Sequence, residues 1–269
     1  MHLESSATVI DNVSFFPKAA VSVERKMTDI RLMWLESPTI AREAQPGQFM
    51  MVRCGDLSLP RPLSIHQIKN DSLALLFAVL RDGRGSKWLS ERRAGDRVQL
   101  LGPLGNGFSV DSTSSALLLI AGGMGIAPLY FLADRAAAKH INVTLLLGAH
   151  TGQLLYPRHL IPASIRVFAA TDDGSSGQTG MVTSLIAREA EHADQVFACG
   201  PLAMYRDMSV NKNRLGLAGK PVQVSVEAVM GCGHGVCYGC TVATKQGLRQ
   251  VCKDGPVFEL GDLSLTDLS

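Results

Sequence analysis

Four of the six cysteines lie between residues 232 and 252, and their spacing is the feature of the sequence best suited to chemistry. Cys232, Cys237 and Cys240 form the pattern C-x4-C-x2-C, and Cys252 follows at a distance. This is the plant-type pattern for a [2Fe-2S] cluster, in which four thiolates hold two irons, ions that favour sulfur ligands. Glycines interleave with these cysteines, so the backbone can bend tightly and direct amide N–H groups at the sulfurs. The segment therefore predicts a cluster-binding loop.

Two other interpretations of the cysteines remain open at this point. Structural zinc also takes four cysteines, but zinc sites favour paired C-x2-C knuckles, and only one pair here has that spacing. Ordinary buried thiols would require no particular spacing. His234 lies inside the loop and could replace a ligand, but four thiolates already suffice, so a solvated or hydrogen-bonding His234 is the better interpretation.

Two short turns indicate a flavin. The segment Arg61-Pro62-Leu63-Ser64 offers an Arg for a diphosphate and a Ser hydroxyl for a flavin or its phosphate, with a proline that fixes the backbone. An R-x-x-S alone is weak, because it occurs by chance and usually caps a turn. The segment Gly83–Ser86 adds a second small-residue turn suited to close approach by phosphate.

Glycines between an apolar run and a helical pattern predict a nucleotide loop. Gly122, Gly123 and Gly125 precede a helix that starts near Pro128, and a helix N-terminus attracts a diphosphate. The pattern differs from G-x-G-x-x-G, and such a turn is more often a tight connection.

Two later segments strengthen this prediction. Asp172 lies in Thr171–Gly174, and Cys199 precedes Gly200 and Pro201. Both segments should end strands on the carboxyl edge where doubly wound folds bind ligands. Cys199 has two interpretations, an inert buried thiol or, as we prefer, a residue beside a nicotinamide.

The elements that position these residues change in kind along the chain. Short β-runs separated by turns predict an antiparallel barrel, at 7–15, 30–36, 47–54, 72–80 and 96–102. Apolar runs that alternate with helical patterns predict a doubly wound α/β domain; the runs lie at 116–123, 142–149, 165–171 and 195–200, and the helices near 126–139, 180–191 and 202–213. Periodicity stops near residue 223. We expect a multidomain α+β chain with a flavin-binding barrel (1–110), a nucleotide-binding domain (111–222) and a [2Fe-2S] subdomain (223–269).

Composition excludes several other classes of protein. A chain of 269 residues with 46% hydrophobic residues can bury a sizeable core. The net charge of +2, without a basic cluster, gives no indication of nucleic-acid binding. No stretch has the apolar length of a membrane span, and the first residues lack the order of a secretory signal. We expect no membrane association and a cytoplasmic location.

Motifs along nearly the whole chain resemble the ferredoxin-NADP reductase superfamily and, more closely, the electron-transfer subunits of class 1B dihydroorotate dehydrogenases. The two most specific motifs are CGHGVCYGC and VCKDGPVF, and the others are GQF at 47–49, RPLS, GRGS, LGPLGNGF, AGGMGIAPL, TDDGSSG and ACGP. The resemblance implies cluster ligation by Cys232, Cys237, Cys240 and Cys252. It implies FAD contacts at Arg61, Pro62, Leu63, Ser64, Ala78, Val79, Leu80, Gly85 and Ser86. Leu63 departs from the aromatic residue of the wider superfamily, and Ser86 replaces the usual Thr but retains the hydroxyl.

The resemblance also implies a function. An FMN-containing partner subunit would oxidise dihydroorotate at its FMN, and this chain would relay the electrons through [2Fe-2S] and FAD to NAD. The two subunits would form a hetero-oligomer that serves pyrimidine biosynthesis. A flavin is needed because nicotinamide exchanges two electrons and the cluster one. The alternatives are a similar subunit of a sulfhydrogenase or of a ferredoxin oxidoreductase, or a non-catalytic metal-binding module. The choice of NAD over NADP rests on the resemblance alone.

Overall fold

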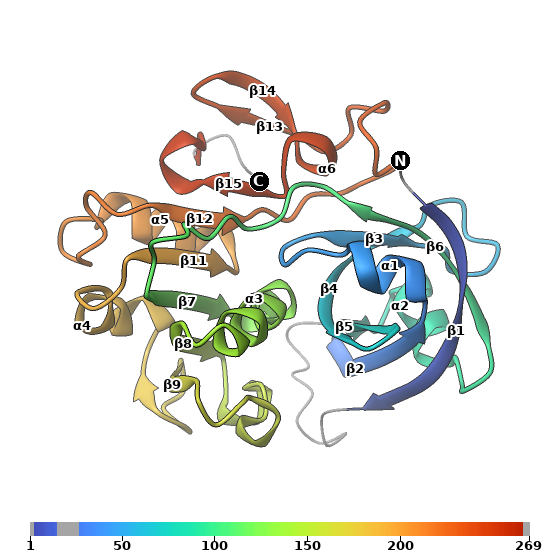
Figure 1. Cartoon of the computed structure of the whole chain (residues 1–269), viewed down its shortest axis with the longest axis horizontal. Coiled ribbons are helices and arrows are strands. Elements are labelled where there is room, and N and C mark those ends of the chain that lie inside the picture. Colours follow the sequence, from blue (N-terminus) through green and yellow to red (C-terminus); the bar gives the residue numbers. More distant parts are fainter. Residues whose placement is uncertain (1–2, 15–26, 266–269) are drawn as a thin grey trace.

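Strands rich in apolar residues close the N-terminal part of the chain into an antiparallel barrel (Figure 1). The computed structural model describes residues 3–14 and 27–265. The barrel strands follow the order β1-β2-β5-β4-β3-β6, and two short helices, α1 and α2, connect them. Their bounds are β1 (Leu3–Ser14), β2 (Met27–Glu36), α1 (Pro38–Glu43), β3 (Phe49–Val52), β4 (Arg61–Lys69), β5 (Ser72–Leu80), α2 (Arg84–Ser90) and β6 (Arg97–Leu104). The expected barrel is confirmed; Phe15, the last residue of its first expected strand, lies outside the described residues.

Strand β4 is the strand of the barrel that the sequence did not predict. It begins at Arg61, so the RPLS segment is a strand and not a turn, and its residues pair with β3, with Pro62 opposite Met51. A proline removes a ladder donor and argues against a strand, but it is tolerated near a strand's beginning. The strand makes Arg61 and Ser64 part of a rigid barrel wall.

A seven-stranded sheet with the order β10-β9-β8-β7-β11-β12-β15 follows the barrel. Its bounds are β7 (Ala116–Gly122), β8 (Asn142–Ala149), β9 (Arg166–Thr171), β10 (Gln178–Thr179), β11 (Gln195–Cys199), β12 (Val222–Ser225) and β15 (Val257–Glu259). All neighbours pair in parallel except β12 and β15. The α-helices are α3 (Ile126–Ala138), α4 (Ile186–Ala190) and α5 (Leu202–Val210), which confirms the expected doubly wound character. The sheet continues to Ser225, past the expected boundary at 222.

Helix α3 lies between the sheet and the barrel (Figure 1). Its Phe131 is completely buried in the hydrophobic cluster of the barrel interior, whereas its Leu129 packs in the cluster that also contains the sheet residue Leu119. Because α3 is buried on both sides, it fixes the barrel against the sheet.

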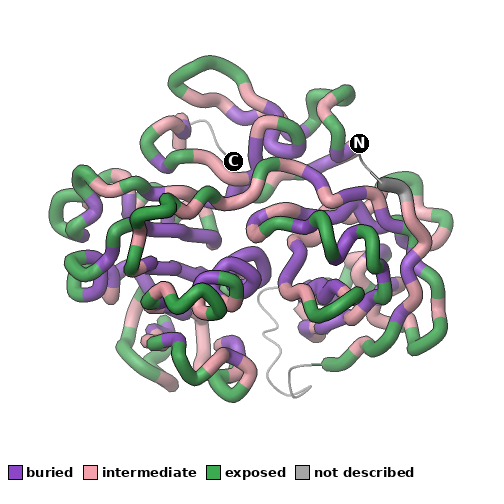
Figure 2. The backbone as a smooth tube through the Cα atoms, viewed as in Figure 1, coloured by how far each residue is buried: buried purple, intermediate pink, exposed green. Residues whose placement is uncertain are grey.

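The C-terminal segment lies above both the barrel and the sheet, and its exposed parts are a loop and a hairpin (Figures 1 and 2). It contains β13 (Thr241–Thr244), β14 (Gly247–Gln250) and α6 (Val251–Asp254) before β15. Cys240 and Cys252 share one hydrophobic cluster with Met51 of the barrel and Val224 of the sheet. The chain thus brings all three parts together around these cysteines.

Single-turn 3-10 helices complete the fold: η3 (Gly123–Gly125), η4 (Gly152–Leu154), η5 (Arg158–Leu160), η6 (Val182–Leu185) and η7 (Leu260–Asp262). Among the described residues, no helix combines the length and apolar character needed to cross a membrane.

Candidate functional site

A pocket on the barrel wall gathers most of the residues expected to bind a flavin. Strand β4 contributes four of them, β5 contributes two, and the first turn of α2 contributes one: Arg61, Pro62, Leu63, Ser64, Ala78, Leu80 and Ser86. Met124 and Pro128 of the nucleotide domain close the other side. Val79 is 5% exposed and belongs to the barrel core, because neighbouring residues of a strand point to opposite faces. Only its backbone could meet a ligand there.

Gly85 has a packing role beside this pocket. A Cβ on Gly85 would lie 2.6 Å from Nε of Arg61, so the missing side chain leaves room for the guanidinium. Arg61 donates a hydrogen bond from Nη1 to the Leu59 carbonyl (2.7 Å), and this bond orients the guanidinium group. The Ser86 hydroxyl is within 3.1 Å of both the Leu80 N–H and the Gly83 carbonyl. Ser86 therefore fixes the turn that borders the pocket.

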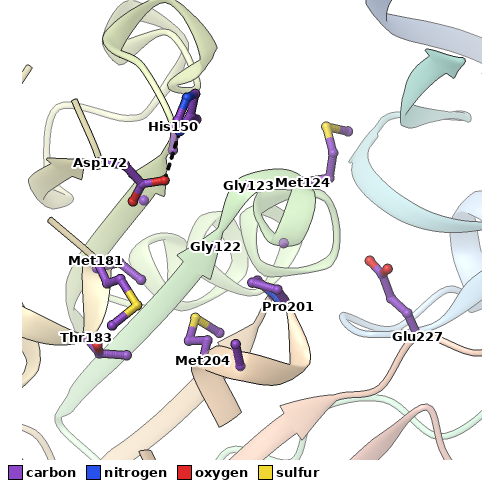
Figure 3. Close-up of a pocket in the computed structure, with 16 residues that line it drawn as sticks. Gly122, Gly123, Met124, His150, Asp172, Met181, Thr183, Pro201, Met204 and Glu227 are labelled. Atoms are coloured by element: carbon purple, nitrogen blue, oxygen red, sulfur yellow. Dashed lines mark hydrogen bonds and ion pairs between the residues drawn. The ribbon is translucent and has the colours of Figure 1, made fainter. Parts of the chain in front are cut away.

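A second pocket lies at the carboxyl edge of the sheet, where the three expected nucleotide segments meet (Figure 3). The expected residues that line it are Gly122, Gly123, Gly125, Asp172, Gly200 and Pro201. Met124, Met181 and Met204 supply much of its apolar surface. The sheet topology brings these residues together, because parallel strands all end at this edge.

The glycines of this pocket fall into two groups. A Cβ on Gly125 would lie 1.8 Å from the backbone oxygen of Cys199, and one on Gly200 would lie 3.0 Å from Cα of Gly122. These glycines let two strand ends touch. Gly123 has φ +58° and nothing within 4 Å of its Cβ position, so its backbone faces the open pocket. It is the glycine of the loop best placed to approach a diphosphate.

Charged groups in the nucleotide pocket are few and mainly acidic. His150 Nδ1 lies 3.1 Å from the Asp172 carboxylate (Figure 3), and Glu227 is the other charged residue that lines the pocket. Among the described residues, no Lys or Arg lines it. His150, the basic residue of the pocket, is thus already paired with the Asp172 carboxylate.

Cys199 and Glu227 lie where the flavin and nucleotide pockets approach each other. Cys199 lines a small third pocket together with Ser64 and Ser225, and Glu227 lines all three pockets. Burial raises the pKa of the Cys199 thiol, and nearby Glu227 raises it further, so Cys199 stays a neutral thiol. Glu227 retains contact with solvent, but the protein atoms that crowd it raise its pKa by desolvation.

Glu227 is the residue of this site that the sequence did not reveal. It follows the end of β12, at the same edge as the other ligand-facing segments, and its side chain points toward the space beside Met124 and Pro201 (Figure 3). The signal was an acid directly after a short apolar strand. It was hidden because residues beyond 222 were interpreted as part of the cysteine loop.

The four clustered cysteines form two pairs. Cys232 and Cys237 interact through their side chains, and so do Cys240 and Cys252. Burial opposes ionisation of Cys232, but N–H groups of residues 234, 236 and 237 and the Cys237 side chain lower its pKa to about 6. Burial and the neighbouring Cys240 raise the pKa of Cys252 to about 12. The Cys232–Cys237 pair is therefore partly exposed, and its Cys232 ionises readily, whereas the Cys240–Cys252 pair is buried.

The two cysteine pairs supply the sulfur donors that a [2Fe-2S] cluster requires. A [2Fe-2S] cluster takes two thiolates on each iron, which two cysteine pairs can supply. In the described part of the chain, no three His, Cys, Asp or Glu side chains converge on a point where one metal ion could bind. His234 Nδ1 instead lies 2.8 Å from the Cys232 carbonyl. The two cysteine pairs fit the donor set of a two-iron cluster.

Comparison with known proteins agrees with this arrangement. Residues 227–264 match the model of the iron–sulfur cluster binding domain of dihydroorotate dehydrogenase B, and residues 119–209 match the oxidoreductase NAD-binding domain. A solved structure of an NADH-dependent reduced ferredoxin-NADP oxidoreductase superposes with a TM-score of 0.83 at 26% identity, over 97% of this chain and 91% of that one. The barrel, the nucleotide domain and the paired cysteines define an electron-transfer flavoprotein with the ferredoxin-NADP reductase fold.

Curated relatives specify the family. The electron transfer subunit of dihydroorotate dehydrogenase B (NAD(+)) from Geobacillus thermodenitrificans is 35% identical over 86% of this chain and 91% of its own length. The subunit of the same name from Desulforamulus reducens is 40% identical over 84% and 89%. The chain belongs to the family of dihydroorotate dehydrogenase B electron transfer subunits.

Proposed function

We propose that this chain binds FAD, a [2Fe-2S] cluster and NAD, and passes electrons from a dihydroorotate-oxidising partner to NAD. The observation that carries the proposal is that Glu227 lines the flavin and nucleotide pockets and the small pocket between them, while the paired cysteines lie in the same C-terminal segment. Flavin chemistry connects the two-electron exchange of a nicotinamide with the one-electron exchange of a cluster.

The roles of the residues follow from their positions. Arg61 offers a guanidinium to the FAD diphosphate, and the Ser64 hydroxyl lies on the wall where the flavin would bind. Gly123 opens the loop to the NAD diphosphate. Cys199 lies deep between the two pockets, where a neutral thiol can contact a nicotinamide without acting as a base or nucleophile.

Two features of Glu227 make it the candidate for holding a proton near the reacting rings. Its carboxyl group borders the flavin and nucleotide pockets, and the protein atoms around it raise its pKa by desolvation, so it binds a proton more readily than a fully solvated carboxyl group. In this proposal the carboxyl group orients the nicotinamide and limits water between the rings.

The charges of the nucleotide pocket favour NAD over NADP. A 2'-phosphate needs Lys or Arg, and in the described part of the chain neither lines the pocket, whereas the Asp172 carboxylate can accept a hydrogen bond from a ribose hydroxyl. Repulsion between Asp172 and a phosphate would weaken binding of NADP further.

The partner in this proposal is an FMN-containing catalytic subunit in a hetero-oligomer, and a cytoplasmic location belongs to the same proposal. Apolar side chains on the cysteine loop and the β13–β14 hairpin support a docking surface there. Val229, Val236, Tyr238 and Leu248 are between 66% and 85% exposed. Contact at this surface would bring a partner near the cysteines.

A second candidate is a subunit of the same architecture that serves a ferredoxin oxidoreductase. The observation that favours it is the TM-score of 0.83 with the ferredoxin-NADP oxidoreductase structure. The higher identity to the dihydroorotate dehydrogenase subunits, up to 40%, favours the first proposal. A sulfhydrogenase subunit has no comparable observation in its favour.

The proposal is tested by the visible spectrum of anaerobically purified protein, with assays for iron, sulfide, zinc and flavin. We expect flavin bands and a sulfide-bearing two-iron cluster that bleach on addition of NADH. The isolated chain should reduce artificial acceptors with NADH and show no dihydroorotate turnover. Zinc without sulfide, absence of bleaching, or dihydroorotate turnover by the chain alone would contradict the proposal.

The docking surface is tested separately by co-purification with the FMN subunit. Val229→Glu should weaken assembly, whereas Val210→Glu, at an equally exposed valine on α5, should not. Equal assembly of both variants would exclude this surface.

A further inference from the structure

A buried amide lies beside the cysteine pairs without a hydrogen-bond partner. Gln250 is the last residue of β14, and it is only 8% exposed. Among the described residues, its Nε2 has no acceptor. Buried polar groups are nearly always hydrogen-bonded, so an orphan N–H donor indicates an acceptor that protein atoms do not supply.

Backbone contacts with residues next to the cysteines hold Gln250 in place. Its backbone N–H donates to the Asp254 carboxylate (2.7 Å), and it pairs across the hairpin with Thr241, the neighbour of Cys240. It precedes Cys252 by two residues. The amide is therefore attached to the same hairpin and turn that carry the buried cysteine pair.

The amide also touches the loop that carries the other pair. Its Oε1 lies 3.0 Å from the position that a Cβ would take on Gly235, which lies between Cys232 and Cys237. The backbone of Gly235 hydrogen-bonds to the Cys252 thiol. One end of the Gln250 amide thus contacts the loop where that loop meets Cys252, so the amide lies between the two segments that carry the cysteine pairs.

We infer that Gln250 donates an N–H hydrogen bond to a sulfur of the [2Fe-2S] cluster, a cysteine thiolate or a sulfide. The inference rests on the proposed cluster. Such a bond is stronger when the sulfur carries more negative charge, so it stabilises the reduced cluster more than the oxidised one. Gln250 is therefore a positioning residue that raises the reduction potential of the cluster.

The test is the cluster potential of the holoprotein, measured by a redox titration followed by electron paramagnetic resonance. Gln250→Met keeps an unbranched side chain of similar length and removes the donor. We expect the equilibrium constant for one-electron reduction to fall roughly tenfold, which is a potential lower by about 59 mV. The matched control is Gln246→Met, at an exposed glutamine of the same hairpin, and its potential should equal that of the wild type.

The outcomes separate this inference from the proposed function. Wild-type protein without a two-iron cluster would contradict both. A Gln250→Met variant with full cluster content and an unchanged or higher potential would overturn the role of Gln250 alone. If Gln250→Met does not retain the cluster, Gln250→Leu serves for the same comparison. Loss of the cluster from both variants would also overturn the inference, because the amide would then be required for assembly.

Discussion

Replacement of His66 should remove a pH-dependent part of the stability. His66 lies on β4 of the barrel and is completely buried, with Nδ1 3.0 Å from the Ala127 carbonyl of α3 and Nε2 3.0 Å from the Tyr156 hydroxyl. A carbonyl can only accept, so Nδ1 carries the proton, and Nε2 accepts from Tyr156. The neutral ring therefore joins the barrel to the nucleotide domain.

The size of the effect follows from the pKa of His66. Burial lowers it from 6.5 to about 4, although the carbonyls of Ala127 and Ile126 oppose the shift. In the unfolded chain the ring binds a proton below about pH 6.5, whereas in the folded protein it stays neutral until about pH 4. Between these values the unfolded state binds more protons, so stability falls with falling pH. The total loss is about 3 kcal/mol, of which about 2 kcal/mol is lost by pH 5.

Urea denaturation of the wild type and of His66→Asn between pH 8 and pH 4.5 measures this effect. Asparagine can retain a donor to the Ala127 carbonyl but has no charge, so the variant should be less stable near pH 8 and approach or exceed the wild type near pH 4.5. His192→Asn, at an exposed histidine, should run parallel to the wild type. A constant difference between wild type and His66→Asn over this range would refute the reasoning.

Three further predictions concern the two pockets. Gly125→Ala should lower the free energy of unfolding by about 3 kcal/mol or more, because a backbone oxygen occupies the space of the new Cβ. Gly123→Ala should cost only about 1 kcal/mol, and thermal melts with equal losses would contradict this difference. Asp172→Ser should lower the NADH-to-NADPH ratio of kcat/KM by roughly tenfold, and an unchanged ratio would exclude repulsion by the carboxylate. Arg61→Met should weaken FAD binding by about tenfold or more in a flavin-retention assay, whereas exposed Arg53→Met should not; equal retention would remove Arg61 from the flavin site.

Much of the fold could be predicted because buried parallel strands have uninterrupted apolar sequences. Strands β7, β8, β9 and β11 agree with the expected runs to within a residue or two. Strand β4 could not be predicted, since Pro62 argues locally against a strand, and the strand is stabilised by its pairing with β3 and β5. Strand β15 has three residues, too few for a periodicity, and its position depends on a distant partner.

The candidate site shows the same division between local and tertiary signals. Cysteine spacing along the chain singled out four thiols as one predicted site, but it did not show their division into the pairs Cys232–Cys237 and Cys240–Cys252. The predicted loop glycines line the nucleotide pocket, but the sequence did not show that Gly125 serves packing and Gly123 faces the pocket. Glu227 was missed because its meaning depends on β12 ending at the ligand edge.

The antiparallel pairing of β15 with β12 affects how this chain could be cut or recombined. The register joins Gln223 to Glu259 and Ser225 to Val257, so the cysteine-bearing segment leaves the sheet and returns to it. Removal of residues after 226 would leave β12 as an unprotected sheet edge, which is a template for aggregation. A chimaera that exchanges the cysteine loop should therefore join within residues 226–256 and keep both strands from the same parent.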